Sequence, residues 1–368
     1  MRECCCSLTL LVLGLIFVNE LLMPGRKVAL LMHDSLSGEN GKMGIGMLRY
    51  SQADVVAVID RSKAGKLSTD FVANGQKAPV VATVREAKSL GAESVLVGIA
   101  PSGGLLPQGW REELLQCLEL GMAVINPLHV RLADDKEFLN RGKVWDVRVE
   151  PEGLQPGTGE ARNLTCPRIL TVGTDMSVGK MTACLEINKE LRNCGVKSKM
   201  VATGQVGICI TGRGVALDAV RVDFAAGAIE REMMEVGKDA DLVLIEGQGA
   251  ICHPGATANL ALIRGSMPTH LILVARAKQT TIRNEPWSTI PPLGELMTLY
   301  QDIATCCGTF EKPIPLGIAL NTSELSDSEA EREVSKVSEE TGLPVTDPVR
   351  FGAGSFANQI QLSVLPTS

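Results

Sequence analysis

Short apolar runs alternate with amphipathic stretches along the first part of the chain. The runs have the length and composition of buried β-strands, and the stretches between them repeat their apolar residues with the period of a helix. Strands are predicted at residues 28–32, 55–59, 80–82, 95–99 and 123–125, and helices at 84–90 and 110–120. Because this alternation is typical of βαβ units, we expect a parallel sheet covered by helices.

A second series of the same kind follows a segment rich in glycine and proline. Residues 151–159 contain five Gly or Pro, which predicts a linker, here assigned to 151–165. Beyond it, strands are predicted at 169–172, 200–203, 242–245, 271–275 and 315–320, and helices at 180–194, 220–236, 293–306 and 326–341. The sequence therefore predicts an α/β chain with an N-terminal domain over 23–150 and a C-terminal, doubly wound domain over 166–368.

Composition agrees with two folded domains and excludes several classes of protein. The 368 residues are 45% hydrophobic and 21% charged and include 37 Gly, proportions that exclude a disordered or fibrous chain. The net charge is -6 and no run of Lys and Arg occurs, so nucleic acid is not an expected partner. The 11 cysteines form no C-x2-C pair, which argues against a zinc site or a disulfide framework and favours a reducing cytoplasm.

The first 22 residues form an apolar extension that stands apart from this pattern. The run at 8–18 is shorter than the roughly 20 residues that span a bilayer. Asn19 and Glu20 follow it, where a signal peptide would carry small residues. The preferred interpretation is a translation start at Met23. Export or membrane tethering and an ordinary N-terminal helix are the alternatives.

Segment 168–182 carries the strongest chemical signal in the sequence. An apolar strand ends there in a loop flanked by Gly173 and Gly179, and Lys180 opens the next helix. The N–H groups of such a loop converge on an anion, the helix N-terminus adds its dipole, and the lysine adds a full charge. A phosphate group is therefore the expected ligand. The residues assigned to this cofactor-binding loop are Gly173, Thr174, Asp175, Met176, Ser177, Val178, Gly179, Lys180, Met181 and Thr182.

This loop departs from the common G-x4-G-K-[ST] pattern in two ways. Five residues separate Gly173 from Gly179, which resembles the longer loop of dethiobiotin synthetase, and that enzyme's Gly-Thr-Asp opening is also present at 173–175. Met181 stands where a hydroxyl would bind Mg²⁺, and Thr182 points about 100° further round the helix. We therefore expect a diphosphate held without magnesium, and we predict no metal site.

Candidate catalytic and substrate-binding residues follow the neighbouring strands. Ligands of doubly wound sheets bind at the carboxyl ends of the strands. Glu246 follows the strand at 242–245, and His253 lies eight residues beyond its end; both are groups that transfer protons. Gln205 and Arg213 follow the strand at 200–203 among several glycines, and a guanidinium there can fork a carboxylate or a phosphate.

Further candidates end the last two strands of the series. Arg276 and Arg283, with Lys278, form a basic cluster that we expect to face an acidic substrate. Asn321 can read a purine edge through its amide. For each of these positions a solvated charge or a plain loop is the alternative. In the N-terminal domain, residues 42–46 and 98–104 are interpreted as glycine loops, and no G-x-G-x-x-G follows the first strand, so a dinucleotide site is not predicted.

Five segments together resemble the D-glutamate N-acetyltransferase family, long classed as a domain of unknown function. They are residues 42–50, 98–101, 173–182, 212–215 and 246–249, and the resemblance extends from about residue 27 to 356. It implies a Rossmann-like first domain, a P-loop NTPase-like second domain, and transfer of an acetyl group from acetyl-CoA to the amino group of D-glutamate. On this implication the loop would cradle the diphosphate of coenzyme A, Glu246 or His253 would be the base, and Arg213, Arg276 and Arg283 would hold the acceptor's carboxylates.

Two other functions remain open on the sequence. An ATP- and magnesium-dependent ligase or kinase of the dethiobiotin synthetase type would share the loop, Glu246 and Asn321, but Met181 counts against it. A non-catalytic nucleotide-binding protein is the third possibility, because a fold and a phosphate loop do not establish catalysis. A small-molecule substrate is the expected partner, a membrane is not, and a homo-oligomer is compatible with the sequence.

Overall fold

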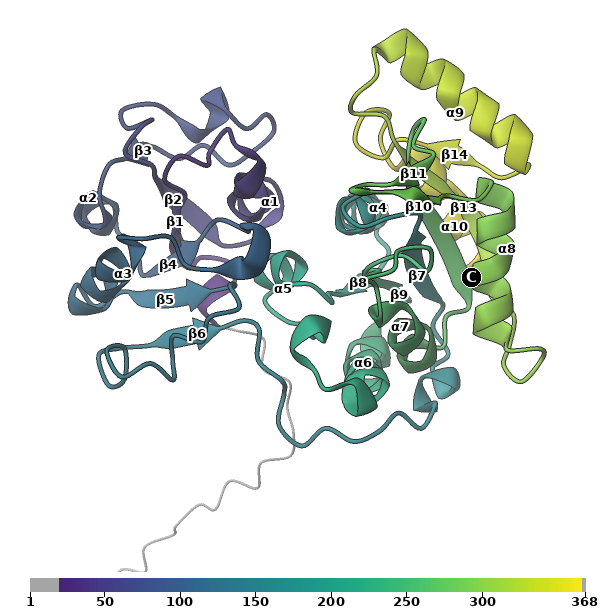
Figure 1. Ribbon diagram of the computed structural model, residues 1–368, viewed down its shortest axis with the longest axis horizontal. Coiled ribbons are helices and arrows are strands. Elements are labelled where there is room, and N and C mark those ends of the chain that lie inside the picture. Colours follow the sequence, from purple (N-terminus) through teal and green to yellow (C-terminus); the bar gives the residue numbers. More distant parts are fainter. Residues whose placement is uncertain (1–19, 366–368) are drawn as a thin grey trace, which may run out of the picture.

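The structure, a computed structural model, describes residues 20–365 and folds them into two parallel sheets with helices on both faces (Figure 1). The predicted α/β class is confirmed. Residues 1–19, which include most of the apolar extension, and residues 366–368 lie outside the described part. Within residues 20–365, no helix combines the length and the apolar character that a bilayer crossing needs.

The N-terminal sheet has the strand order β3-β2-β1-β4-β5-β6, with every pair parallel. This is the order of Rossmann folds. Alternate residues of each strand point to opposite faces: Ala29 and Leu31 pack with helices α2 and α3, whereas Val28 and Leu30 pack with α1. The elements are β1 (Lys27–Leu31), α1 (Lys42–Tyr50), β2 (Asp54–Ile59), β3 (Val80–Val81), α2 (Val84–Ser89), β4 (Ser94–Val97), α3 (Trp110–Glu119), β5 (Ala123–Asn126) and β6 (Val144–Asp146).

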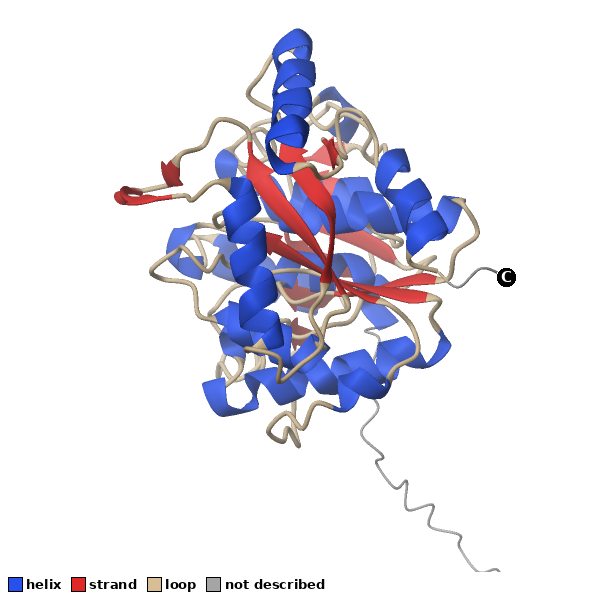
Figure 2. Ribbon diagram, turned by 90° about the vertical axis from the view of Figure 1, so that its right-hand side faces the viewer, coloured by secondary structure: helices blue, strands red, loops and turns tan. Residues whose placement is uncertain are grey.

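The C-terminal sheet has the order β14-β13-β10-β7-β9-β8 and is also parallel. Its strands are β7 (Arg168–Gly173), β8 (Ser198–Val201), β9 (Leu242–Ile245), β10 (His270–Arg276), β13 (Ile314–Asn321) and β14 (Val345–Thr346). A separate antiparallel hairpin, β11 (Thr281–Ile282) and β12 (Glu285–Thr289), projects from the body of the molecule (Figure 2).

Helices cover both faces of this second sheet. Helices α4 and α10 share one apolar cluster with the strands, and α6, α7 and α8 share the cluster of the opposite face. The helices are α4 (Lys180–Asn193), α5 (Gln205–Thr211), α6 (Val222–Val236), α7 (Ala258–Ser266), α8 (Leu293–Thr305), α9 (Asp327–Thr341) and α10 (Gly354–Ser363). Short 3-10 turns occur at Glu20–Leu22, Glu39–Gly41, Ser68–Asp70, Ser102–Gly104, Glu160–Asn163, Leu217–Ala219 and Gly237–Asp239.

The two domains meet where α1 packs against α5. One apolar cluster contains Met47 of α1 together with Val206 and Ile210 of α5, so the core continues from one domain into the other. Beside it, the Tyr50 hydroxyl donates a hydrogen bond to Glu186 Oε1 on α4, at 2.6 Å. The junction is therefore both apolar and hydrogen-bonded.

The glycine loops predicted at both sides of this junction are helices instead. Residues 42–46 begin α1, and residues 205–207 begin α5. A Cβ on Gly44 would lie 2.1 Å from Met32 Sδ, and one on Gly207 would lie 2.3 Å from Glu246 Oε2. The glycines thus allow close approach of the helices, and the loop interpretation is wrong because that need outweighs glycine's poor helix propensity.

Candidate active site

The predicted phosphate loop connects the buried strand β7 to helix α4. Ser177 and Gly179 both have positive φ, 56° and 115°, so the chain turns back over the end of β7 before the helix begins. Glycine adopts this conformation at little cost, whereas Ser177 pays for it. The strand–loop–helix arrangement inferred from the sequence is therefore present.

Six consecutive N–H groups of this loop are free to bind an anion. The N–H groups of residues 177–182 donate to no acceptor within residues 20–365. The carbonyl of Val178, which would accept from Thr182 in a continued helix, instead accepts from Asn321 Nδ2 at 3.1 Å. Unpaired donors at a helix N-terminus favour a negatively charged group, and here they extend back into the loop.

Lys180 lies beneath the loop and closes it. The side chain is 7% exposed, and its Nζ donates to the carbonyl of Asp175 at 2.7 Å. A Cβ on Gly173 would lie 2.8 Å from that Nζ, so the glycine provides the space that the ammonium occupies. Burial lowers the pKa of Lys180 to about 8, and nearby Asp175 and Glu246 oppose that shift. Lys180 therefore remains mostly charged at neutral pH.

Asp175 ties the loop to the hairpin segment. Its Oδ1 accepts from the N–H of Met176 at 2.6 Å, while Oδ2 accepts from Gln279 Nε2 and from the Arg283 N–H, both at 2.7 Å. The carboxylate is thus directed at the protein itself. It positions the loop, and the predicted direct contact with the cofactor stays a prediction.

Asp175→Asn is expected to loosen this segment, because an amide presents its NH₂ to at least one of the N–H donors that the carboxylate now accepts. Losing such a charge-assisted bond should lower the free energy of unfolding by about 1–3 kcal/mol and increase proteolytic cleavage between residues 279 and 290. Urea denaturation and limited proteolysis measure both effects. Asp134→Asn, at an exposed surface ion pair with Arg131, is the control and should change neither.

Glu246, at the carboxyl end of β9, is the buried carboxylate of the site. Its Oε2 accepts from the N–H groups of Thr203 and Gly204 at 3.0 and 3.3 Å, and Oε1 has no hydrogen-bond partner in the described chain. Burial raises the pKa of Glu246 to about 7, although the two N–H donors and Lys180 act in the opposite direction. A carboxylate with one free oxygen and a pKa near neutrality has the properties of a general base.

His253 lies in the turn after Glu246 and is held in one tautomer. Its Nδ1 accepts from the Gly255 N–H at 3.0 Å, so the proton of the neutral ring is on Nε2. This nitrogen can donate a hydrogen bond but is not a free base. Between the two residues predicted to be catalytic, the geometry favours Glu246 as the proton acceptor.

A cavity of about 340 Å³ opens beside the loop, between the ends of β10 and β13, the segment before α8, and α9. It is lined by Thr174, Arg276 and Lys278, among others. Thr174 Oγ1 and Gln279 Oε1 are buried there without hydrogen-bond partners. Arg276 borders both the cavity and the loop, since it pairs with Glu324 at 2.5 Å and reaches the carbonyl of Ser177 at 3.3 Å. Unpartnered polar atoms and cations suit a polar, anionic ligand.

Other predicted loop and substrate residues have clear structural positions. Met181 packs its side chain against the apolar cluster of α4, so it presents no oxygen to a metal. Asn321 supports the loop through Val178, and its Oδ1 accepts from the Ser323 N–H at 3.0 Å. Both ends of that amide are engaged, and purine recognition by Asn321 stays a prediction. The side chain of Arg283 is exposed at the hairpin turn.

Arg213 is not brought together with the loop, and Gln205 is only near Glu246. Gln205 opens α5 directly after Gly204, whose N–H binds Glu246. Arg213 follows the other end of α5, where its Nε donates to the fully buried Glu232 at 2.7 Å. It lines a different cavity, bounded by Lys197 and Ser198 at the start of β8. The loop and Arg213 thus lie at opposite ends of the sheet.

Three residues that support the site carried no recognisable signal in the sequence. Gln279 holds Asp175, and the N–H of Thr203 binds Glu246. Tyr300, inside α8, donates to the carbonyl of Gly173 at 2.8 Å and accepts from the Ile251 N–H at 2.9 Å. Burial raises the pKa of Tyr300 to about 12. Each contact joins segments far apart in the sequence, which no local pattern reveals.

Fold and site together define a two-domain α/β protein in which a Rossmann-like sheet is followed by a P-loop phosphate-binding domain. Comparison with protein families agrees: residues 61–150 match the Rossmann-like N-terminal domain of DUF1611, and residues 155–357 match the P-loop domain of the same family, both described as domains of unknown function. The chain belongs to this family, whose curated members are named as D-glutamate N-acetyltransferases. The resemblance found in the sequence is confirmed, and the protein is an N-acetyltransferase.

The relatives cover most of the chain. A D-glutamate N-acetyltransferase of Tritonibacter scottomollicae is 37% identical over 284 residues, which is 76% of this chain and 84% of that protein. The enzyme of the same name from a Pseudoalteromonas species is 33% identical over 280 residues, 74% of this chain and 83% of its own. A crystal structure of a DUF1611 family protein from Anabaena variabilis ATCC 29413 has 45% identity, covers 92% of this chain and 99% of that one, and has a TM-score of 0.86.

Proposed function

We propose that this enzyme transfers the acetyl group of acetyl-CoA to the amino group of D-glutamate, and that its P-loop binds the diphosphate of the coenzyme. The proposal rests chiefly on one observation: six free N–H groups and the buried Lys180 surround an anion position in which Met181 supplies no magnesium ligand. The names of the two relatives support the choice of donor chemistry and acceptor.

In the proposed reaction, Glu246 takes a proton from the ammonium of the acceptor, because only the free amine attacks a thioester. The nitrogen forms a bond to the acetyl carbon, the carbon–sulfur bond breaks, and the coenzyme leaves as a thiolate that recovers a proton. His253 Nε2 and the N–H groups near Gly249 are the candidate donors to the oxygen that becomes negative in the tetrahedral intermediate. No covalent intermediate with the protein is needed.

The acceptor's two carboxylates need cations close to Glu246 and the loop. Arg276, Lys278 and Arg283 belong to the segment that borders the loop, and Arg276 lies beside Ser177. We assign the acceptor to these residues. Arg213, whose guanidinium is paired with Glu232 at the other end of the sheet, is left out of the acceptor site.

A coupled assay tests the proposal directly. The purified protein is mixed with acetyl-CoA and D-glutamate in EDTA, and the free thiol is measured. We expect thiol release with D-glutamate, much less with L-glutamate, and no phosphate release from ATP with magnesium and D-glutamate. Phosphate release without thiol would instead support the ligase, and neither signal would support a binding protein.

A cytoplasmic location is part of the same proposal. All eight cysteines in the described part of the chain are free thiols, and Cys117, Cys166, Cys184 and Cys209 are buried. Unpaired cysteines are typical of reducing compartments.

A further inference from the structure

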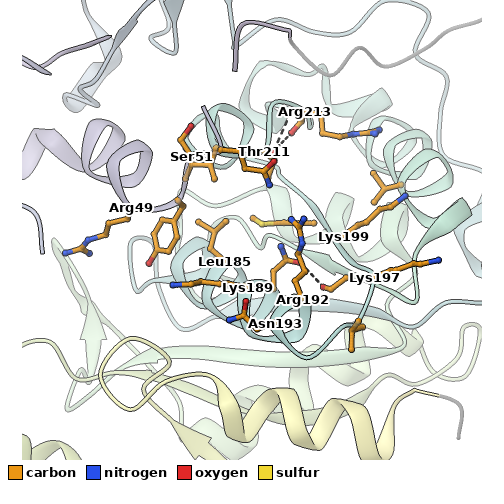
Figure 3. A pocket seen from close by; sticks show the side chains of 18 of the residues that line it. Arg49, Ser51, Leu185, Lys189, Arg192, Asn193, Lys197, Lys199, Thr211 and Arg213 are labelled. Atoms are coloured by element: carbon orange, nitrogen blue, oxygen red, sulfur yellow. Dashed lines mark hydrogen bonds between the residues drawn. The ribbon is translucent and has the colours of Figure 1, made fainter. Parts of the chain in front are cut away.

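The largest cavity of the described chain lies between the two domains, away from the P-loop. It has a volume of about 1030 Å³ and is formed by the end of α1, the second half of α4, the start of β8 and the end of α5 (Figure 3). From Lys180, at the loop, α4 runs for 14 residues, or about 20 Å, toward this cavity. The P-loop residues are not part of its wall. Any ligand here would occupy a second site.

Six cationic side chains surround this cavity. Figure 3 shows Arg49, Lys189, Arg192, Lys197, Lys199 and Arg213 around it, and Asp239 is the one acidic residue of its lining. The chain as a whole has a net charge of -6, so the cavity reverses the overall sign locally. Such a concentration of one charge in a concave site attracts ligands of the opposite charge.

These cations are largely without partners in the protein. Of the six, only Arg213 forms an ion pair within the described residues, and its Nη2 is still buried without a hydrogen-bond partner. Gathering like charges is unfavourable unless a ligand neutralises them, and a buried unpaired donor costs free energy until something accepts from it. Both observations indicate an anionic ligand with more than one charged group.

The wall also has an apolar part. Leu185, Val196, Met200 and Ile210 line it, and the ring of Tyr50 borders it while its hydroxyl is held by Glu186. The Tyr50 ring is therefore fixed in orientation. A ligand that combines phosphate groups with a flat or apolar portion would contact both kinds of surface.

We propose that this interdomain cavity binds a small phosphate-bearing organic molecule of the nucleoside diphosphate class, separately from the P-loop. Guanidinium groups fork phosphate oxygens, which suits Arg192 and Arg213. Because Arg49 and Tyr50 belong to the N-terminal domain and the other cations to the C-terminal domain, the bound molecule would connect the two domains at their junction.

The test uses the full chain carrying Lys180→Met, so that the P-loop contributes little to phosphate binding. Titration calorimetry in EDTA with ADP and with sodium pyrophosphate should show one site for each. Adding Arg192→Gln, Lys197→Gln and Lys199→Gln should weaken both about 10- to 100-fold, because three charge contacts are removed. The matched control adds Arg85→Gln, Lys77→Gln and Lys136→Gln, which remove the same charge from positions outside the cavity, and should change affinity less than about twofold.

Several results would overturn the proposal. These are no ADP or pyrophosphate binding in the Lys180→Met protein, or equal weakening by the cavity and control substitutions. Pyrophosphate binding without ADP binding would refute the organic portion of the ligand, and citrate binding as tightly as pyrophosphate would refute the phosphate assignment. Should the triple variant fail to fold, Lys197→Gln alone, an exposed loop position, is expected to weaken ADP binding by about threefold, and unchanged affinity would again refute the site.

Discussion

Glu246→Gln is expected to lower kcat by about 10²- to 10⁴-fold, the contribution typical of a positioned general base. The amide retains an oxygen that can accept from the N–H groups of Thr203 and Gly204, so the loop geometry should persist. What disappears is the free carboxylate oxygen Oε1. Steady-state rates with acetyl-CoA and D-glutamate measure the effect.

The matched control is Glu230→Gln. Glu230 is also a buried carboxylate that accepts N–H donors, from Thr158 and Glu160, but it anchors the segment between the domains. Its substitution should reduce stability and leave kcat within a few-fold of the wild type. A Glu246→Gln enzyme with nearly wild-type kcat would remove Glu246 from the proposed reaction.

The pH dependence provides a second measurement on the same residue. Since burial raises the pKa of Glu246 to about 7, kcat/KM should rise with pH through that value, and Glu246→Gln should lose this limb. Stability has the opposite sign. A carboxyl group with a raised pKa in the folded state stabilises the fold below its unfolded value of 4.5, and this contribution is lost as pH rises through about 7. Glu246→Gln should therefore gain on the order of 2 kcal/mol relative to wild type between pH 5 and pH 8, measurable by urea denaturation.

Lys180→Met is expected to lower kcat/KM for acetyl-CoA by about 10- to 100-fold, mainly through KM, because the ammonium would act on the bound diphosphate rather than on the reacting carbonyl. Methionine retains most of the buried side-chain volume. Lys77→Met, at an exposed position, is the control for loss of one positive charge. If the two variants had the same KM for acetyl-CoA, the coenzyme phosphates could not be bound at Lys180.

The order of strands and helices could be predicted largely from the hydrophobic pattern. Strands β7 and β9 occur within one residue of the predicted ranges, because buried parallel strands are short apolar runs with clear ends. Helices α1 and α5 could not be predicted, since Gly44 and Gly207 read locally as turn residues. Only the presence of Met32 and the Glu246 carboxylate against those glycines explains them, and both contacts are tertiary.

The candidate site was predictable in part for a similar reason. Gly179, Lys180 and Glu246 stand at strand ends, where topology alone brings residues of different strands to one edge of the sheet. Arg213 stands at an equally suggestive position, but the length of α5 carries it to the other end of the sheet, beside Glu232. The supporting contacts of Gln279 and Tyr300 depend on side-chain geometry that the sequence does not encode locally.

Binding of coenzyme A measured by titration calorimetry, in EDTA and in magnesium chloride, tests most directly whether the P-loop holds a diphosphate without a metal. The predicted result is one site of equal affinity in both buffers for the wild type, and a site weakened at least about tenfold in Lys180→Met. Binding that requires magnesium, or that is unchanged by Lys180→Met, would contradict it.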